Sequence, residues 1–163
     1  MAGPLQMLDR AVGRIVGAAA VLALPLALLL FLQWPLRDWV QQWSREANDA
    51  GQVLFAFYSA CAITYATRSH AHLAVDAWTE NLPVQLRAAA ARVFSGAAVA
   101  WSAWMIWVVW PATRQSVLQL EGFPETFNPG YFALRIALVL LLALLLAQSL
   151  LDAVRGPPPA PHA

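Results

Sequence analysis

The chain has 163 residues, of which 60% are apolar and only 12% are charged, and its formal net charge is +1 at pH 7. A soluble domain is about 25% charged, so this composition favours lipid over water as the main solvent. The small net charge gives no support to a nucleic-acid partner, and the single cysteine, Cys61, excludes a disulfide scaffold and a CxxC redox pair.

Four apolar stretches approach or exceed the roughly 20 residues that a helix needs to cross a bilayer. They run over about 15–32, 51–67, 93–110 and 131–151. The sequence therefore predicts an all-α integral membrane protein with four transmembrane helices in a single domain, residues 1–155. The segment 156–163 is rich in proline, which cannot continue a helix, and is predicted to be a disordered tail.

The first stretch contains Pro25, which is expected to kink its helix because proline lacks a backbone N–H. Gly13 and Gly17 form a small-xxx-small step, a pattern that lets membrane helices approach closely. Gly96 and Ala100 form a similar step in the third stretch. We expect these small residues to pack against neighbouring helices or against a partner subunit.

Residues 36–48, between the first and second stretches, have an amphipathic pattern with helical spacing. The apolar face carries Leu36, Trp39, Val40, Trp43 and Ala47. The pattern predicts an interfacial helix on the outer membrane surface, which either lies in the headgroup layer or docks on a larger membrane partner. Asn48 or Asp49 is then expected to cap the second transmembrane helix.

The loop after the second stretch concentrates titratable side chains. His70 and His72 precede Asp76, which resembles a metal-ligand pattern, but imidazoles at i and i+2 diverge on a helix and no further cysteine or histidine completes a tetrahedral set. A hydrogen-bonded loop is therefore favoured over a metal site. Arg68 suits the negative end of the second helix, and Pro83 is expected to open the third.

The third stretch carries four tryptophans at three-residue spacing, which favours an aromatic belt over a groove-filling role. They are Trp101, Trp104, Trp107 and Trp110. The third helix is expected to end before Pro111. Asn128 and Pro129 are expected to form the cap and first turn of the fourth helix.

Arg135 lies about two turns into the fourth predicted helix. Its charge is expected to snorkel outward or to pair with Glu121 or Glu125 in the preceding loop. No acidic residue lies deep within any apolar stretch, whereas proton and cation relays usually need one.

The distribution of arginine predicts the orientation, because cytoplasmic loops carry an excess of positive charge. With both termini in the cytoplasm, six arginines lie inside and four outside. The inner set is Arg10, Arg14, Arg68, Arg87, Arg92 and Arg155, and the outer set is Arg37, Arg45, Arg114 and Arg135.

The inner loop carries a family resemblance. Arg68, the run from His72 through Val75 to Asp76, and Pro83 together resemble the small permease subunit of tripartite ATP-independent periplasmic (TRAP) transporters. The four predicted helices and the amphipathic outer helix match that family as well. This chain has Ala71 and Ala74 where members often have a glycine and a basic residue.

The resemblance implies a non-enzymatic, multi-pass subunit of a sodium-coupled importer of organic acids in the bacterial inner membrane. A periplasmic substrate-binding protein would deliver the substrate to a large many-span permease, which the small subunit braces. No cofactor is implied for this chain, because the sodium and substrate sites would lie in the large permease. A membrane assembly or scaffold protein outside transport is the alternative.

Overall fold

The computed structural model describes residues 3–40, 45–69 and 83–155, and helices dominate all three ranges. The helices are α1 (Pro4–Ala20), α2 (Ala23–Val40), α3 (Arg45–Arg68), α5 (Val84–Leu118) and α6 (Tyr131–Arg155). Within these ranges the only β-type pairing is an isolated bridge between Gly122 and Pro129. The predicted all-α fold is confirmed.

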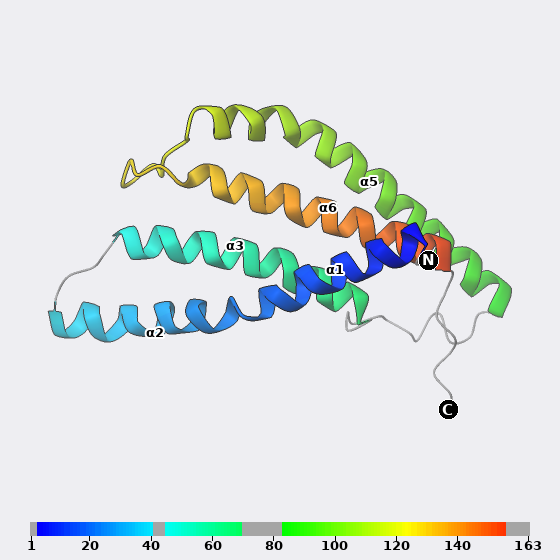
Figure 1. Ribbon diagram of the computed structural model, residues 1–163, viewed down its shortest axis with the longest axis horizontal. Helices are drawn as coiled ribbons and strands as arrows, with labels where there is room; N and C mark the ends of the chain where they lie inside the picture. The colour runs from blue at the N-terminus through cyan, green and yellow to red at the C-terminus, as the bar shows by residue number, and fades with distance from the viewer. Residues whose placement is uncertain (1–2, 41–44, 70–82, 156–163) are drawn as a thin grey trace.

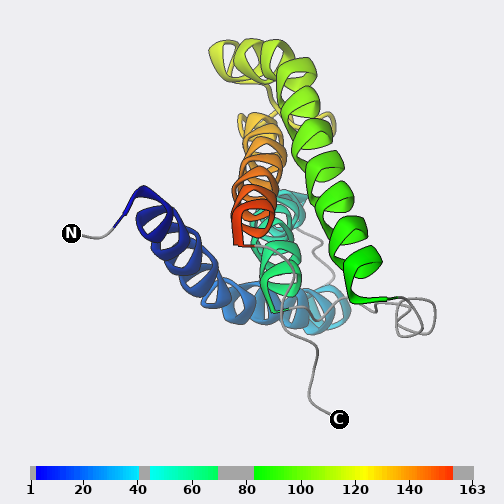
Figure 2. The same cartoon turned by 90° about the vertical axis from the view of Figure 1, so that its right-hand side faces the viewer.

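The helices form a row in which α6 packs between α5 and α3, and α3 also contacts α1 and α2 (Figure 1). Viewed roughly along the helix axes, α1 diverges from α3 and α6 toward the N-terminus (Figure 2). We call the end that holds Pro4, Arg68 and Arg155 the N-terminal end. The opposite end, which holds the connection between α5 and α6, is the turn end.

Among the described residues, three segments are long and apolar enough to cross a membrane: Pro4–Leu29, Ala88–Leu118 and Tyr131–Val154. They correspond to the first, third and fourth predicted stretches. α3 has 24 residues but is not apolar enough to be among them. Its first turns carry Arg45, Glu46 and Asp49, which lower its hydropathy although the rest of the helix is uncharged up to Arg68.

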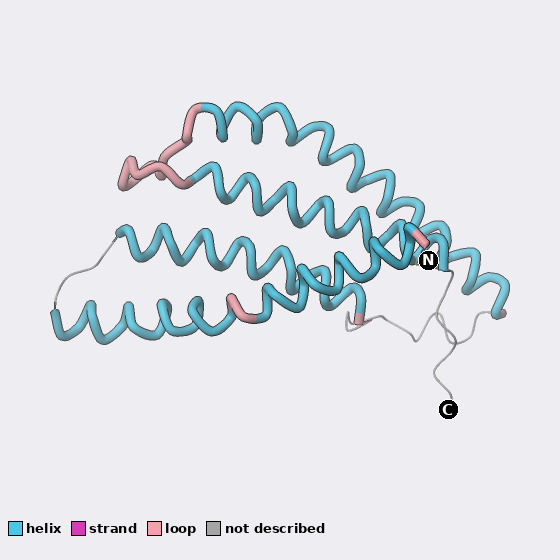
Figure 3. The backbone as a smooth tube through the Cα atoms, in the orientation of Figure 1, coloured by secondary structure: helices cyan, strands magenta, loops and turns pink. Residues whose placement is uncertain are grey.

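The first predicted helix is broken at Val21 and Leu22, which separate α1 from α2 (Figure 3). Pro25 has no backbone N–H, so the Val21 carbonyl lacks the donor that a regular helix places four residues later. The tighter bond from the Val21 N–H to the Ala18 carbonyl, 3.2 Å, ends α1 at this point. The kink expected from Pro25 is therefore a break one turn before it.

The predicted end of the third helix at Pro111 is wrong. α5 passes through Pro111 and continues to Leu118, so the loop begins eight residues later than expected. A proline removes one backbone hydrogen bond from a helix, and the remaining backbone hydrogen bonds are enough for α5 to continue past it. Thr113 Oγ1 donates to the Val109 carbonyl at 3.0 Å, a contact typical of bent helices, and α5 is visibly curved near this end (Figure 1).

The start of the fourth helix also differs from the expectation. α6 begins at Tyr131, and Asn128 and Pro129 belong to the turn that precedes it. The Asn128 carbonyl accepts a bond from the Phe123 N–H at 2.9 Å, and Pro129 forms the bridge with Gly122. These contacts close the connection between α5 and α6 into a compact turn.

The interfacial helix predicted over residues 36–48 is not a separate element in the described residues. Residues 36–40 are the end of α2, and residues 45–48 open α3. Nothing between Pro35 and Val40 interrupts the helix that α2 has already begun. Trp43, with residues 41–44, lies outside the described residues, so the amphipathic pattern around it remains a prediction.

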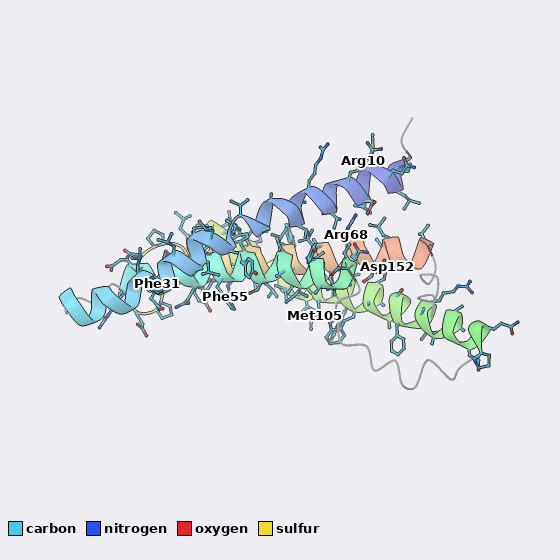
Figure 4. The ribbon with its side chains drawn as sticks, turned by 90° about the horizontal axis from the view of Figure 1, so that it is seen from below. Arg10, Phe31, Phe55, Arg68, Met105 and Asp152 are labelled. Atoms are coloured by element: carbon cyan, nitrogen blue, oxygen red, sulfur yellow. The ribbon has the colours of Figure 1, made fainter. Side chains whose placement is uncertain are left out.

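The core lies mainly where α6 meets α3. Leu144 of α6 packs against Cys61 of α3, and Leu151 at the N-terminal end is fully buried. By contrast, large apolar side chains cover the outer surface, including Phe31 and Phe55 (Figure 4). An apolar surface of this extent is expected where lipid or another membrane protein replaces water.

Candidate functional site

The turn end is closed by an ion pair between the loop and α6. Arg135 donates from Nε and Nη2 to the two carboxylate oxygens of Glu121, at 2.9 and 3.1 Å. Ser116 also donates to Glu121, and the Arg135 guanidinium lies 5.9 Å from the centre of the Tyr131 ring. The structure thus brings Glu121 to Arg135, while Glu125 is exposed on the turn.

Hydrogen bonds lower the pKa of Glu121 below its ordinary value, the one from Arg135 first and the one from Ser116 second. Its charged form is therefore favoured in the folded protein. The pair stabilises the turn between α5 and α6 while Glu121 is ionised, and protonation removes the acceptor charge.

We expect acid to weaken this turn by titrating Glu121. A lowered pKa contributes stability that is complete above the ordinary glutamate pKa of about 4.3 and is lost as the pH falls through the lower folded value. Thermal unfolding of the detergent-solubilised chain from pH 7 to pH 3 should show a smaller acid-induced loss in Glu121→Gln than in the wild type. Glu125→Gln is the matched control and should follow the wild-type curve; identical curves for all three would contradict the assignment.

A second contact at the turn end was not predicted from the sequence. Asp49 in α3 is only 8% exposed, and its carboxylate accepts a bond of 2.6 Å from Thr126 Oγ1. Asp49 does not cap α3, because that helix begins four residues earlier at Arg45. The bond instead ties α3 to the α5–α6 turn.

At the N-terminal end, Arg68 of α3 pairs with Asp9 of α1. The Arg68 Nη1 lies 2.7 Å from Asp9 Oδ1 and donates to the Asp9 carbonyl at 3.3 Å. The guanidinium also lies against Gly13, where an added Cβ would be 3.6 Å from Nη2. Gly13 therefore leaves the space that the Arg68 side chain fills.

The rest of the predicted inner-loop motif is only partly described. His72, Val75 and Asp76 lie outside the described residues. Pro83 stands at the N-cap position of α5, directly before Val84. Arg68, which the sequence groups with His72 and Asp76, has Asp9 as its described ion-pair partner.

The predicted packing residues differ in their surroundings. Gly17 and Gly96 have open space where a Cβ would stand, and Ala100 is exposed. The side chain of Trp39 and the whole of Trp43 lie outside the description. The small residues at 17, 96 and 100 thus face away from the packed interior of this chain.

The α5 tryptophans face outward as a group. The exposed residues are Trp101, Trp104, Trp107 and Trp110, and the first two rings meet edge to face with centroids 5.5 Å apart. Ser102, between them in sequence, points inward and is fully buried. An exposed indole surface suits the lipid interface or a membrane partner.

The described residues contain no cluster of three histidine, cysteine, aspartate or glutamate side chains that could hold a metal. Asp9, Glu121 and Asp49 are instead paired with Arg68, Arg135 and Thr126, respectively. These contacts connect helices to one another or to the turn, so their evident chemistry is structural.

Long apolar helices, an apolar exterior and ion pairs that lie near the ends of the described helices define a multi-pass membrane protein. The family model for the DctQ component of tripartite ATP-independent periplasmic transporters matches residues 26–156. The chain therefore belongs to this family, the small permease component of TRAP transporters. Comparisons with curated proteins and with solved structures gave no match.

The match confirms the family resemblance found in the inner loop and covers four of the five described helices completely or in large part. A component of a tripartite transporter implies a large permease and a substrate-binding protein as partners. Membership is consistent with a non-enzymatic role in transport at the bacterial inner membrane.

Proposed function

We propose that this chain is the bracing subunit of a sodium-coupled importer of organic acids, with the substrate and sodium sites in the large permease. The match to the small TRAP permease component over residues 26–156 carries this proposal. The chain itself binds no transported solute and acts by holding the large permease in the bilayer.

The contacts between helices support a static role. α1 is tied to α3 by the Asp9–Arg68 pair, and α3 is tied to the α5–α6 turn by the Asp49–Thr126 bond. The Glu121–Arg135 pair fastens the same turn to α6. Because both ends of the helix row carry such ties, the helices are suited to act as one rigid body.

We further propose that α3 is the fourth transmembrane helix. Its 24 residues span about 36 Å at 1.5 Å per residue, more than the hydrocarbon thickness of about 30 Å. It also lies between helices that include candidate spans, α2 on one side and α6 on the other. Four crossings give both termini the same side, which the arginine distribution favours as the cytoplasm.

The inner loop is proposed to contact the large permease. Arg68 ends α3 and Pro83 is the N-cap of α5, so the segment carrying His72, Val75 and Asp76 joins these two helices in sequence. On the opposite side of the membrane, Trp39 and Trp43 would bind either the large permease or the lipid headgroup layer.

Reconstitution tests the bracing role directly. Vesicles that contain the large permease, with its binding protein outside and an inward sodium gradient, should take up organic acid only when this chain is also present. His72→Ala and Asp76→Ala should each lower co-purification of the large permease at least severalfold, with Glu125→Ala as a control at the other end.

Uptake by this chain alone would contradict the proposal, as would full uptake without it. Normal uptake with both loop variants would remove the partner contact from the inner loop but not the bracing role. If the chain co-purified with no large permease at all, an assembly role outside transport would be favoured.

A further inference from the structure

An apolar groove lies where α1 and α2 meet α3. It has a volume of about 280 Å³ and is lined by Val16, Gly17, Ala20 and Ala23 on one wall and by Tyr58 and Tyr65 on the other. The first wall belongs to the candidate span Pro4–Leu29. The groove therefore faces hydrocarbon when the chain is in a membrane.

The groove is open along α1. Gly17 is exposed, and a Cβ added there would meet no atom within 4 Å. The small side chains of Ala20 and Ala23 continue the same wall across the helix break. Glycine and alanine therefore leave this space free. The groove wall also spans the break between α1 and α2, where a continuous helix would have run straight on.

Two arginines stand beside this groove toward the N-terminal end. Arg14 precedes Gly17 by three residues and Arg10 precedes it by seven, so both lie on the same side of α1 as Gly17. Helical side chains also point toward the N-terminus, which carries both guanidinium groups away from the apolar groove. Arg10 extends away from the helix row in Figure 4.

The charges of Arg10 and Arg14 are not balanced within the described residues. Both side chains are exposed, and neither forms a salt bridge there. Asp9, the neighbouring acid, is paired with Arg68. The end of the groove therefore carries two positive charges that remain for a ligand.

We propose that this groove binds an anionic phospholipid, with an acyl chain between α1 and α3 and the phosphate at Arg10 and Arg14. Basic residues beside pockets between membrane helices are a known means of holding anionic headgroups. A helix of the partner subunit fits less well, because it would bury both arginines and would need acids of its own to balance them.

Native mass spectrometry of the purified full chain can measure this binding. The probes are phosphatidylglycerol and phosphatidylcholine with the same acyl chains, added to the delipidated protein in detergent. The wild type should bind phosphatidylglycerol at least tenfold more tightly. Arg10→Gln with Arg14→Gln should lose about 25-fold in affinity for phosphatidylglycerol, about fivefold for each charge, and little for phosphatidylcholine.

The chain offers matched controls for both parts of the site. Arg92→Gln with Arg114→Gln removes two exposed charges from α5 and should leave binding unchanged. Gly17→Leu fills the groove and should weaken both lipids about tenfold, whereas Gly96→Leu, at an equally open glycine of α5, should weaken neither. The charge variants alter only exposed side chains, so they test the site even if Gly17→Leu does not fold.

Equal losses in the two arginine pairs would show general charge attraction and overturn the proposal. Displacement of phosphatidylglycerol by millimolar glycerol phosphate would assign the site to a free anion, and would overturn it too. Cross-linking of a Gly17→Cys variant, made in a Cys61→Ser background, to the large permease would also overturn the proposal, because the permease and not lipid would then cover the groove.

Discussion

Replacing Gly130 by alanine is expected to destabilise the α5–α6 turn by about 2–3 kcal/mol. Gly130 has a φ of +155°, which side-chain-bearing residues rarely adopt, and an added Cβ would lie 2.9 Å from Phe123 Cε2. The ring of Phe123 cannot yield easily, because it is buried and meets Tyr131 edge to face, with centroids 5.8 Å apart.

The consequence should extend beyond the turn itself. Phe123 accepts and donates backbone bonds that close the turn, and the same turn carries Thr126, the partner of Asp49. A displaced Phe123 would therefore loosen α3 as well as α6. Reversible unfolding of the purified chain in mixed detergent micelles measures the change in free energy of unfolding.

Gly96→Ala is the matched control for this prediction. Gly96 lies within α5, and an added Cβ there meets nothing within 4 Å. Alanine in an open helical position is expected to stabilise by about 0.5–1 kcal/mol, because it reduces the freedom of the unfolded chain. A Gly130→Ala variant as stable as Gly96→Ala would show that the turn does not have this geometry.

The presence of membrane helices could be predicted from sequence because the bilayer fixes the length of an apolar stretch. The residues at which these helices begin and end could not be predicted in the same way. α5 begins nine residues before its predicted stretch and ends eight residues after it. Hydropathy measures how much of a helix meets hydrocarbon, whereas the backbone hydrogen bonds that define the helix continue past the lipid, even through Pro111.

The sequence separation of two residues decides whether their contact could be predicted from the sequence. Arg135 and Glu121 are 14 residues apart and joined by one turn, so the sequence could bring them together. Arg68 and Asp9 are 59 residues apart, and Thr126 and Asp49 are 77 apart. The first pair depends on how α1 packs on α3, and the second on how the α5–α6 turn packs on α3. No local spacing in the sequence carries that information.

Glycine positions illustrate the same limit. Gly13 and Gly17 read as one small-xxx-small step, yet Gly13 accommodates the Arg68 guanidinium and Gly17 opens onto a groove. The pattern identifies surfaces that allow close approach. What approaches each surface is decided by the neighbouring helix, and here the two glycines have different neighbours.

Charge reversal at Arg68 should separate α1 from α3 at the N-terminal end. Arg68→Glu would place a second acid beside Asp9, where the present atoms are 2.7 Å apart, and would lose the bond to the Asp9 carbonyl. Both side chains are about one-third exposed or less. We therefore expect a loss of about 1–2 kcal/mol, more than for an isolated surface pair.

The double reversal makes this prediction specific. Asp9→Arg with Arg68→Glu restores opposite charges and should recover at least half of the lost stability, while Asp9→Arg alone should be as damaging as Arg68→Glu. Double electron–electron resonance between labels on α1 and α3 would report the separation as a longer, broader distance in each single variant. If the double variant is no more stable than the single variants, packing outweighs charge at this contact. The reason would be Gly13, which leaves space for the guanidinium of a residue on α3 and not for one on α1.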